Sequence, residues 1–196
     1  STGGTLALHL AVCDPDVAAL LLYSPNVEIF DPNAKLLAKP WGLQLARLVK
    51  GSDYHEFEDP KPEEHQFWTT KYRVEALTHL QALVDGTMTE DTFAAVDHPV
   101  FLGYYYKDEI HQDSTVSVPA MLRMYEQLGT PVEEKRKVAF PNTVDHVITS
   151  YLTSKDVASV QQATERYLEE VLGLVAVPVS KDKMAETPSA TASLAP

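Results

Sequence analysis

Three residues far apart in the chain, Ser1, Asp108 and His146, have side chains suited to nucleophilic catalysis. A serine hydroxyl becomes a strong nucleophile when a histidine takes its proton, and a carboxylate can hold the imidazole in the required tautomer. If the fold brings these residues together, their types predict acyl transfer through a covalent intermediate. The question is therefore which elements position them.

Ser1 begins the run Ser1-Thr2-Gly3-Gly4, which leads into the helix-forming segment Thr5–Ala11. A hydroxyl followed by small residues and a helix is the S-x-G half of a nucleophile elbow, where backbone crowding at a sharp turn requires small neighbours. The N–H of Thr2 would lie at a helix N-terminus. We expect it to supply half of an oxyanion hole.

Asp108 and His146 each follow a segment with the pattern of a buried strand, 99–106 and 135–140. In an open parallel sheet, side chains at the carboxyl ends of the strands converge on one crevice. Asp113 competes for the acid role, and Asp108 is also a plausible turn residue. We place Asp108 first because it lies closer to the strand end.

His111 lies among Asp108, Glu109 and Asp113, a set of side chains that resembles an oxygen-rich metal site. The segment lacks the glycine turn of a calcium-binding loop. We therefore expect a solvated acidic loop, and we expect no metal and no cofactor.

Strands and helices are expected to alternate on both sides of the central third of the chain. Continuous apolar runs, which are typical of strands buried on both faces, alternate along the chain with segments whose apolar residues recur at helical spacing. This pattern predicts an α/β fold with a mostly parallel, doubly wound sheet. The expected helices are 3–12, 116–128 and 154–172, the last capped by Ser154, and the expected strands are 17–24, 99–106 and 135–140.

Residues 27–98 differ from both ends of the chain because they are rich in helical patterns and poor in strands. Helices are expected over 31–49 with a break at Pro40, over 69–84 and from Thr89, with an acidic surface loop at 52–64. A helical insert between two neighbouring strands is typical of a cap over an active site.

The 196 residues suffice for one or two domains with a sizeable core. The chain has 16 Lys and Arg against 28 Asp and Glu, and its net charge of −12 disfavours nucleic acid as a partner. No apolar run approaches the roughly 20 residues that cross a bilayer, so no transmembrane segment is predicted. Residues 175–196 are expected to form a mobile tail.

Three motifs together resemble the α/β-hydrolases, in particular their capped lysophospholipase and monoacylglycerol-lipase-like members. The order Ser, Asp, His along the chain is the order of the triad in that family. The resemblance implies an elbow, helix and strand in 1–26, a cap in 27–98, a C-terminal core in 99–174 and a tail in 175–196. The motifs are Ser1-Thr2-Gly3-Gly4, the strand and turn of 100–109, and the histidine loop of 142–147.

The resemblance covers only the C-terminal part of such a fold. The first five strands, the Gly-x before the serine and the loop with the second oxyanion N–H have no counterpart in this sequence. We therefore expect a second polypeptide or a further segment to carry that half. The implied activity is a serine hydrolase that cleaves small hydrophobic carboxylic esters with Ser1, Asp108 and His146.

Two other classes of function fit part of the sequence. An N-terminal-nucleophile amidohydrolase would use Ser1 with its own amine as the base, but such enzymes begin on a strand, and Asp108 and His146 would have no role. A non-catalytic α/β-hydrolase fold would serve only assembly or binding. Neither compartment nor acyl chain length follows from the sequence.

Overall fold

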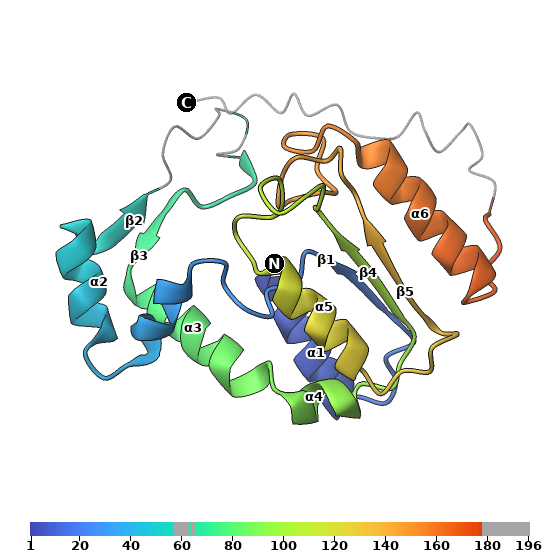
Figure 1. Ribbon diagram of the computed structural model, residues 1–196, viewed down its shortest axis with the longest axis horizontal. Coiled ribbons are helices and arrows are strands. Elements are labelled where there is room, and N and C mark those ends of the chain that lie inside the picture. The colour runs from blue at the N-terminus through green and yellow to red at the C-terminus, as the bar shows by residue number, and fades with distance from the viewer. Residues whose placement is uncertain (57–62, 64–65, 178–196) are drawn as a thin grey trace, which may run out of the picture.

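The computed structural model describes residues 1–56, 63 and 66–177. Its centre is a parallel three-stranded sheet in the order β1 (Leu20–Tyr23), β4 (Val100–Tyr104) and β5 (Lys135–Ala139), with helices on both faces (Figure 1). The predicted α/β class and the parallel sheet are confirmed, and each strand lies within the segment predicted for it.

β4 is the middle strand, and all five of its residues are buried. Its register aligns Leu102 with Leu22 of β1 and with Lys137 of β5. A continuous apolar strand is what a position covered on both faces requires. Because the three strands are parallel, their carboxyl ends lie at the same edge of the sheet.

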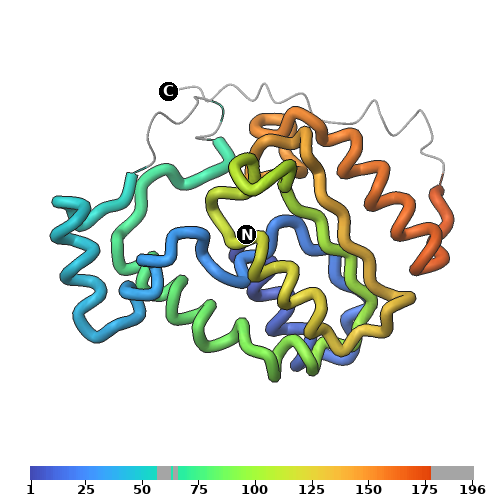
Figure 2. The backbone as a smooth tube through the Cα atoms, in the orientation of Figure 1, coloured from blue at the N-terminus to red at the C-terminus, as the bar shows by residue number. Residues whose placement is uncertain are grey.

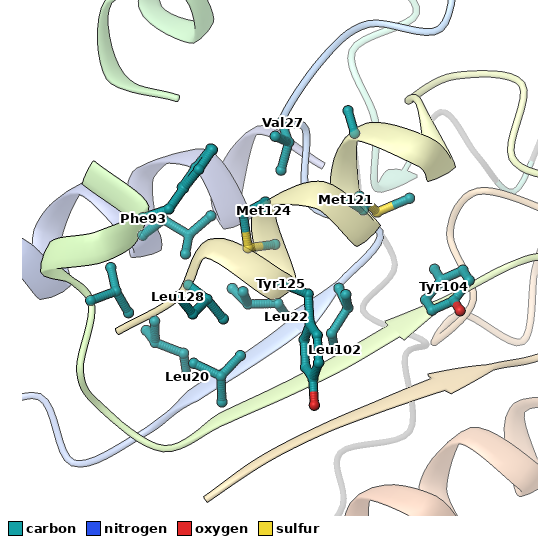
Figure 3. Close-up of a cluster of buried hydrophobic side chains, with 14 of the residues drawn as sticks. Leu20, Leu22, Val27, Phe93, Leu102, Tyr104, Met121, Met124, Tyr125 and Leu128 are labelled. Carbon is teal, nitrogen blue, oxygen red and sulfur yellow. The ribbon is translucent and has the colours of Figure 1, made fainter. Parts of the chain in front are cut away.

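The first face of the sheet is covered by α1 (Thr2–Cys13), α4 (Glu90–Ala95) and α5 (Val118–Gln127). Figure 3 shows apolar side chains of α5 lying against those of β1 and β4. Burial of each such side chain stabilises the fold by about 1.5–3 kcal/mol. The main contributors from the helix and its C-terminal end are Met121, Met124, Tyr125 and Leu128, which lie over Leu20, Leu22 and Leu102.

The opposite face is covered by α6 (Val157–Glu170), whose Tyr167 is fully buried. The rings of Tyr167 and Phe101 lie 5.4 Å apart, and the hydroxyls of Tyr23 and Thr164 are hydrogen-bonded at 2.7 Å. The helix begins later than predicted. Asp156, and not Ser154, is its N-cap, and the Asp156 carboxylate accepts the N–H of Ser159.

Gly103 lies near the carboxyl end of β4 beneath two aromatic rings. A Cβ atom at this position would lie 3.0 Å from the Phe140 ring and 3.3 Å from the Tyr23 ring, with Ile148 at 3.4 Å. A glycine here therefore allows side chains that follow or end the two outer strands to pack over the middle one.

The insert between β1 and β4 contains the helices η1 (Pro32–Ala38), α2 (Gly42–Lys50) and α3 (Glu75–Thr87), and it extends away from the sheet (Figure 2). It also contains an antiparallel hairpin of β2 (Tyr54–Glu56) and β3 (Lys71–Arg73), which the sequence did not predict. The helix expected to begin at residue 69 begins instead at Glu75, after β3.

Pro40 does separate two helices, as predicted, because η1 ends at Ala38 and α2 begins at Gly42. The helix predicted from Thr89 is also present as α4, with the Thr89 hydroxyl accepting the N–H of Thr92. However, α4 packs within the core against α1 and α5, so the last part of residues 27–98 contributes to the sheet's first face.

The two edges of the sheet differ in character. β1 pairs only with β4 among the described residues, and Leu21 on this strand is 39% exposed. Nearby α1 exposes Leu6 and Leu10. The opposite edge, β5, carries the charged run Lys135–Lys137, in which Arg136 and Lys137 form ion pairs with α6 and α5.

Within the described ranges, no helix is long and apolar enough to span a bilayer. Residues 175–177 have no regular structure, and the rest of the predicted tail, like part of the predicted 52–64 loop, lies outside the described residues.

Candidate active site

A cavity of about 520 Å³ opens at the carboxyl edge of the sheet. A volume of this size is suited to a small organic ligand. Ser1 and His146 both line it, together with residues that follow β4 and β5 and two residues of the insert. The other lining residues are Trp68, Thr70, Tyr105, Gln112, Ser114, Thr115, Val144, Asp145, Val147 and Thr153.

Ser1 is held at the start of α1 by the turn that follows β1. The Ser1 carbonyl accepts the N–H of Asn26 at 3.0 Å and that of Gly4 at 2.9 Å. The Asn26 carbonyl in turn accepts the Thr5 hydroxyl at 2.6 Å. These contacts fix the first turn of α1 against the end of β1, and Ser1 itself stays exposed at the cavity.

Gly4 makes this arrangement possible because Pro25 packs directly against it. A Cβ atom at Gly4 would lie 2.5 Å from the Pro25 Cβ and 2.8 Å from its Cα. Ser24, before the proline, has a φ of +43° and is buried. Gly4 thus allows the close approach of the turn, whereas a Cβ atom at Gly3, the glycine of the S-x-G pattern, would meet no atom within 4 Å.

His146 lies in the loop after β5, and its Nδ1 is 2.7 Å from Oδ2 of Asp113. The Asp113 side chain is fully buried, and that of His146 is 14% exposed. The other carboxylate oxygen of Asp113 accepts the N–H groups of Thr115 and Val116. A buried carboxylate satisfied in this way fixes the orientation of the imidazole ring.

The surroundings of Asp113 favour its charged form. Burial acts to raise its pKa, but the hydrogen bond and charge of His146 and the N–H groups of Val116 and Thr115 together hold the pKa below its usual range. The ordinary carboxyl pKa is about 3.9. Since the folded value is lower, the contacts of the Asp113 carboxylate stabilise the fold above that pH, and this stabilisation is lost as the pH falls through the folded pKa.

The expected pairing of Asp108 with His146 is wrong. Asp108 is exposed and contacts His111, with its Oδ1 2.8 Å from the His111 Nδ1. The same oxygen accepts the N–H groups of Ile110 and His111, so Asp108 stabilises a tight turn. The hydrogen bonds of this turn depress the Asp108 pKa without any contribution from His146.

Asp113 reaches the site because residues 106–112 form a short hairpin. Tyr106 and Gln112 make an antiparallel bridge, and the N–H of Asp113 donates to the Tyr105 carbonyl at 3.2 Å. The chain therefore leaves the end of β4 and returns to it. Proximity in sequence favoured Asp108, whereas the hairpin places Asp113 at the strand end.

The residues around His111 do not converge on one point. Asp108 pairs with His111, Glu109 accepts the Tyr106 hydroxyl, and Asp113 faces His146. In the part of the chain that the structure describes, no group of three or more His, Cys, Asp or Glu side chains is arranged to hold a metal ion.

Ser1 and His146 line the same cavity, and among the described residues no hydrogen bond joins their side chains directly. Such contacts are often long in unliganded sites and tighten when a substrate binds. Thr2, the predicted oxyanion donor, is the first residue of α1 and follows Ser1 directly. A helix N-terminus presents free N–H groups at this position.

Trp68 and Thr70 come from the segment that leads into β3, and the sequence reasoning did not single them out. The hairpin carries this segment to the cavity. The sequence shows a tryptophan in the insert, which could have suggested a cavity residue. However, the three-residue strands that bring this segment to the cavity are too short to be recognised by periodicity.

No protein-family model matches the sequence, and no curated protein matches it. The fold, however, is similar to that of solved lipases. A structure of the metagenome-derived lipolytic enzymes LipS and LipT has a TM-score of 0.60 and 18% identity, with 86% of this chain and 62% of that chain covered.

Two monoacylglycerol lipases give similar values. The enzyme from Paleococcus ferrophilus has a TM-score of 0.56 and 14% identity over 86% of this chain and 65% of its own. A soluble variant of the Saccharomyces cerevisiae monoglyceride lipase has a TM-score of 0.58 and 13% identity over 86% and 62%. This chain therefore spans less than two thirds of the length of these structures. Its described residues form part of an α/β-hydrolase fold.

Proposed function

We propose that this chain supplies the catalytic residues of a serine esterase that cleaves small hydrophobic carboxylic esters. The observation that carries the proposal is that Ser1 and His146 line the same cavity, with His146 hydrogen-bonded to the buried Asp113. The lipolytic enzymes with a similar fold support an ester as the substrate class.

In the proposed reaction, the Ser1 Oγ attacks the ester carbonyl carbon while His146 takes the hydroxyl proton. The alcohol leaves with that proton and an acyl ester remains on Ser1. Water then attacks the acyl carbon, His146 accepts the water proton, and the carboxylic acid is released as Ser1 regains its hydrogen. Asp113 keeps the imidazole in the productive tautomer and stabilises its charged form.

The developing oxyanion is assigned to the N–H of Thr2. The positive end of the α1 dipole favours negative charge at this position. One donor of an oxyanion hole contributes about 3–4 kcal/mol to the transition state. The second donor is assigned to a segment outside this chain.

The N-terminal-nucleophile alternative is disfavoured because Ser1 is followed at once by helix α1 and not by a strand. It also gives no role to the contact between His146 and Asp113. His146→Ala separates the possibilities. An N-terminal nucleophile would keep its reactivity in this variant, the triad would lose it, and a binding module would have none in the parent protein.

A small nitrophenyl phosphonate is expected to label the protein once, at Ser1, with release of nitrophenolate. Intact mass and peptide mapping check the stoichiometry and the position, and a chelator is expected to leave the rate unchanged. Labelling at another residue, or ester hydrolysis that requires added metal, would contradict the proposal.

The insert is proposed to act as a cap that selects substrates, because Trp68 lines the cavity with Ser1. Trp68→Ala is expected to change the ratio of kcat/KM for long and short acyl esters by about tenfold. One methylene group in an apolar pocket already changes the kcat/KM discrimination between two substrates by about tenfold or more. The reaction of Ser1 with a small phosphonate should change little.

Trp41→Ala is a matched control, because Trp41 lies in the same insert and is 55% exposed. It should leave both the ester preference and the phosphonate rate within about twofold of the parent. Equal changes in preference for the two tryptophan variants would show that the insert acts through stability and not through the cavity.

We also propose that a second polypeptide or a further segment supplies the remaining strands at β1. Among the described residues β1 pairs only with β4, and Leu6, Leu10 and Leu21 are exposed nearby, which supports this proposal because exposed apolar strand edges favour strand addition. Intact mass and denaturing electrophoresis of the active protein check it. A compact, active monomer of these 196 residues alone would contradict it.

A further inference from the structure

Val144 has an unusual backbone conformation beside the candidate site. Its φ is +58°, in the left-handed region, where a β-branched residue is a rare outlier. Gly and Asn occupy this region with far less strain. Val144 lies two residues before His146 and lines the same cavity as Ser1.

The backbone on both sides of Val144 is fixed by other contacts. Thr143 is buried, its hydroxyl donates to the Phe140 carbonyl at 3.0 Å, and its carbonyl accepts the N–H of Lys155 at 3.2 Å. On the other side, the Asp145 carboxylate accepts the N–H of Val147 at 2.8 Å. A strained residue persists only where its surroundings determine its conformation in this way.

These contacts explain how the strain is maintained but not why the strained residue is a valine. The hydrogen bonds that fix the loop involve Thr143 and Asp145, and none of them uses the Val144 side chain. A glycine would adopt the same backbone more easily. What valine adds is an isopropyl group on a residue that lines the same cavity as Ser1 and His146.

We infer that Val144 is a specificity-determining residue, whose isopropyl group narrows the cavity next to the reacting carbon. It disfavours acyl groups that are branched beside the carbonyl and favours unbranched ones. The inference rests on the proposed esterase function, because it concerns the substrate of the same site.

Three variants distinguish the effect of the Val144 side chain from the effect of its backbone conformation. Val144→Ala shortens the side chain, Val144→Gly removes it and relieves the strain, and Val144→Asn relieves the strain while keeping a side chain of comparable size. Val132→Ala is a control for the loss of the same methyl groups, because Val132 is 79% exposed.

The measurement is kcat/KM for nitrophenyl acetate and for nitrophenyl pivaloate, together with the melting temperature. The pivaloate to acetate ratio is expected to rise about tenfold in Val144→Ala and Val144→Gly. It should stay within about threefold of the parent in Val144→Asn and Val132→Ala. Val144→Gly and Val144→Asn should melt no lower than Val144→Ala, because both accept the left-handed backbone.

The outcomes distinguish this inference from the proposed function. A parent protein that hydrolyses neither ester would refute the esterase proposal and this inference with it. An active parent whose ratio is unchanged in Val144→Ala and Val144→Gly would refute the role of Val144 alone. A ratio that rises equally in Val144→Asn would also refute it, because the backbone and not the isopropyl group would then set the preference.

Discussion

Replacing Asp113 by asparagine is expected to lower kcat/KM for a nitrophenyl ester by about 10⁴-fold. The carboxylate accepts the Nδ1 proton of His146 at 2.7 Å, whereas an amide can donate to Nδ1 and favour the unproductive tautomer. Asparagine is nearly isosteric, so the loop should remain in place. Initial rates, with a thermal melt to confirm folding, measure the effect.

Asp108→Asn is the matched control, because Asp108 lies on the same hairpin and also contacts a histidine. Its side chain is exposed, and its contacts are local to residues 108–111. The expected change in kcat/KM is within about twofold. If Asp108→Asn lost as much activity as Asp113→Asn, the assignment of the acid would have to be reversed.

Gly4→Ala is expected to lower kcat/KM by about 10²-fold, since displacement of a reacting group by about 1 Å can have an effect of that size. The new Cβ would lie 2.5 Å from the Pro25 Cβ and would push away the turn whose Asn26 N–H binds the Ser1 carbonyl. Overpacking of this kind also destabilises by about 1–3 kcal/mol. Ester turnover and chemical unfolding measure the two effects.

Gly3→Ala serves as the control in the same helix turn, because a Cβ at Gly3 meets no atom within 4 Å. It should keep full activity and stabilise the protein by up to about 1 kcal/mol, as Gly to Ala changes in helices do. Equal losses in the two variants would mean that helix flexibility, and not contact with Pro25, sets the position of Ser1.

The strands and helices of the core were predictable because their buried positions carry apolar residues at the spacing of a strand or a helix. Residues 100–104 are apolar throughout, as a middle strand must be, and residues 118–127 carry apolar side chains at helical spacing. Chain order and the ends of these elements then pointed to Ser1 and His146 as neighbours at one edge. Both line the cavity.

The acid and the hairpin of the insert were not predictable in the same way. A short hairpin returns Asp113, and not Asp108, to the end of β4. That hairpin depends on the bridge contacts between Tyr106 and Gln112. β2 and β3 have three residues each and are mostly exposed, so no alternation distinguishes them from a loop. Both the choice of the acid and the β2–β3 hairpin depend on pairing between segments, which the local sequence pattern does not encode.

The position of Gly103 has a consequence for how the site tolerates change. Phe140 follows β5 and Tyr23 ends β1, and both rings pack over Gly103, where a Cβ atom would lie 3.0 Å from one ring and 3.3 Å from the other. Ile148, two residues beyond His146, packs at the same point. Residues next to the segments that carry Ser1 and His146 therefore pack together over a position that has no side chain. A residue without any chemistry of its own thus limits how far these segments can move apart while the rings stay packed.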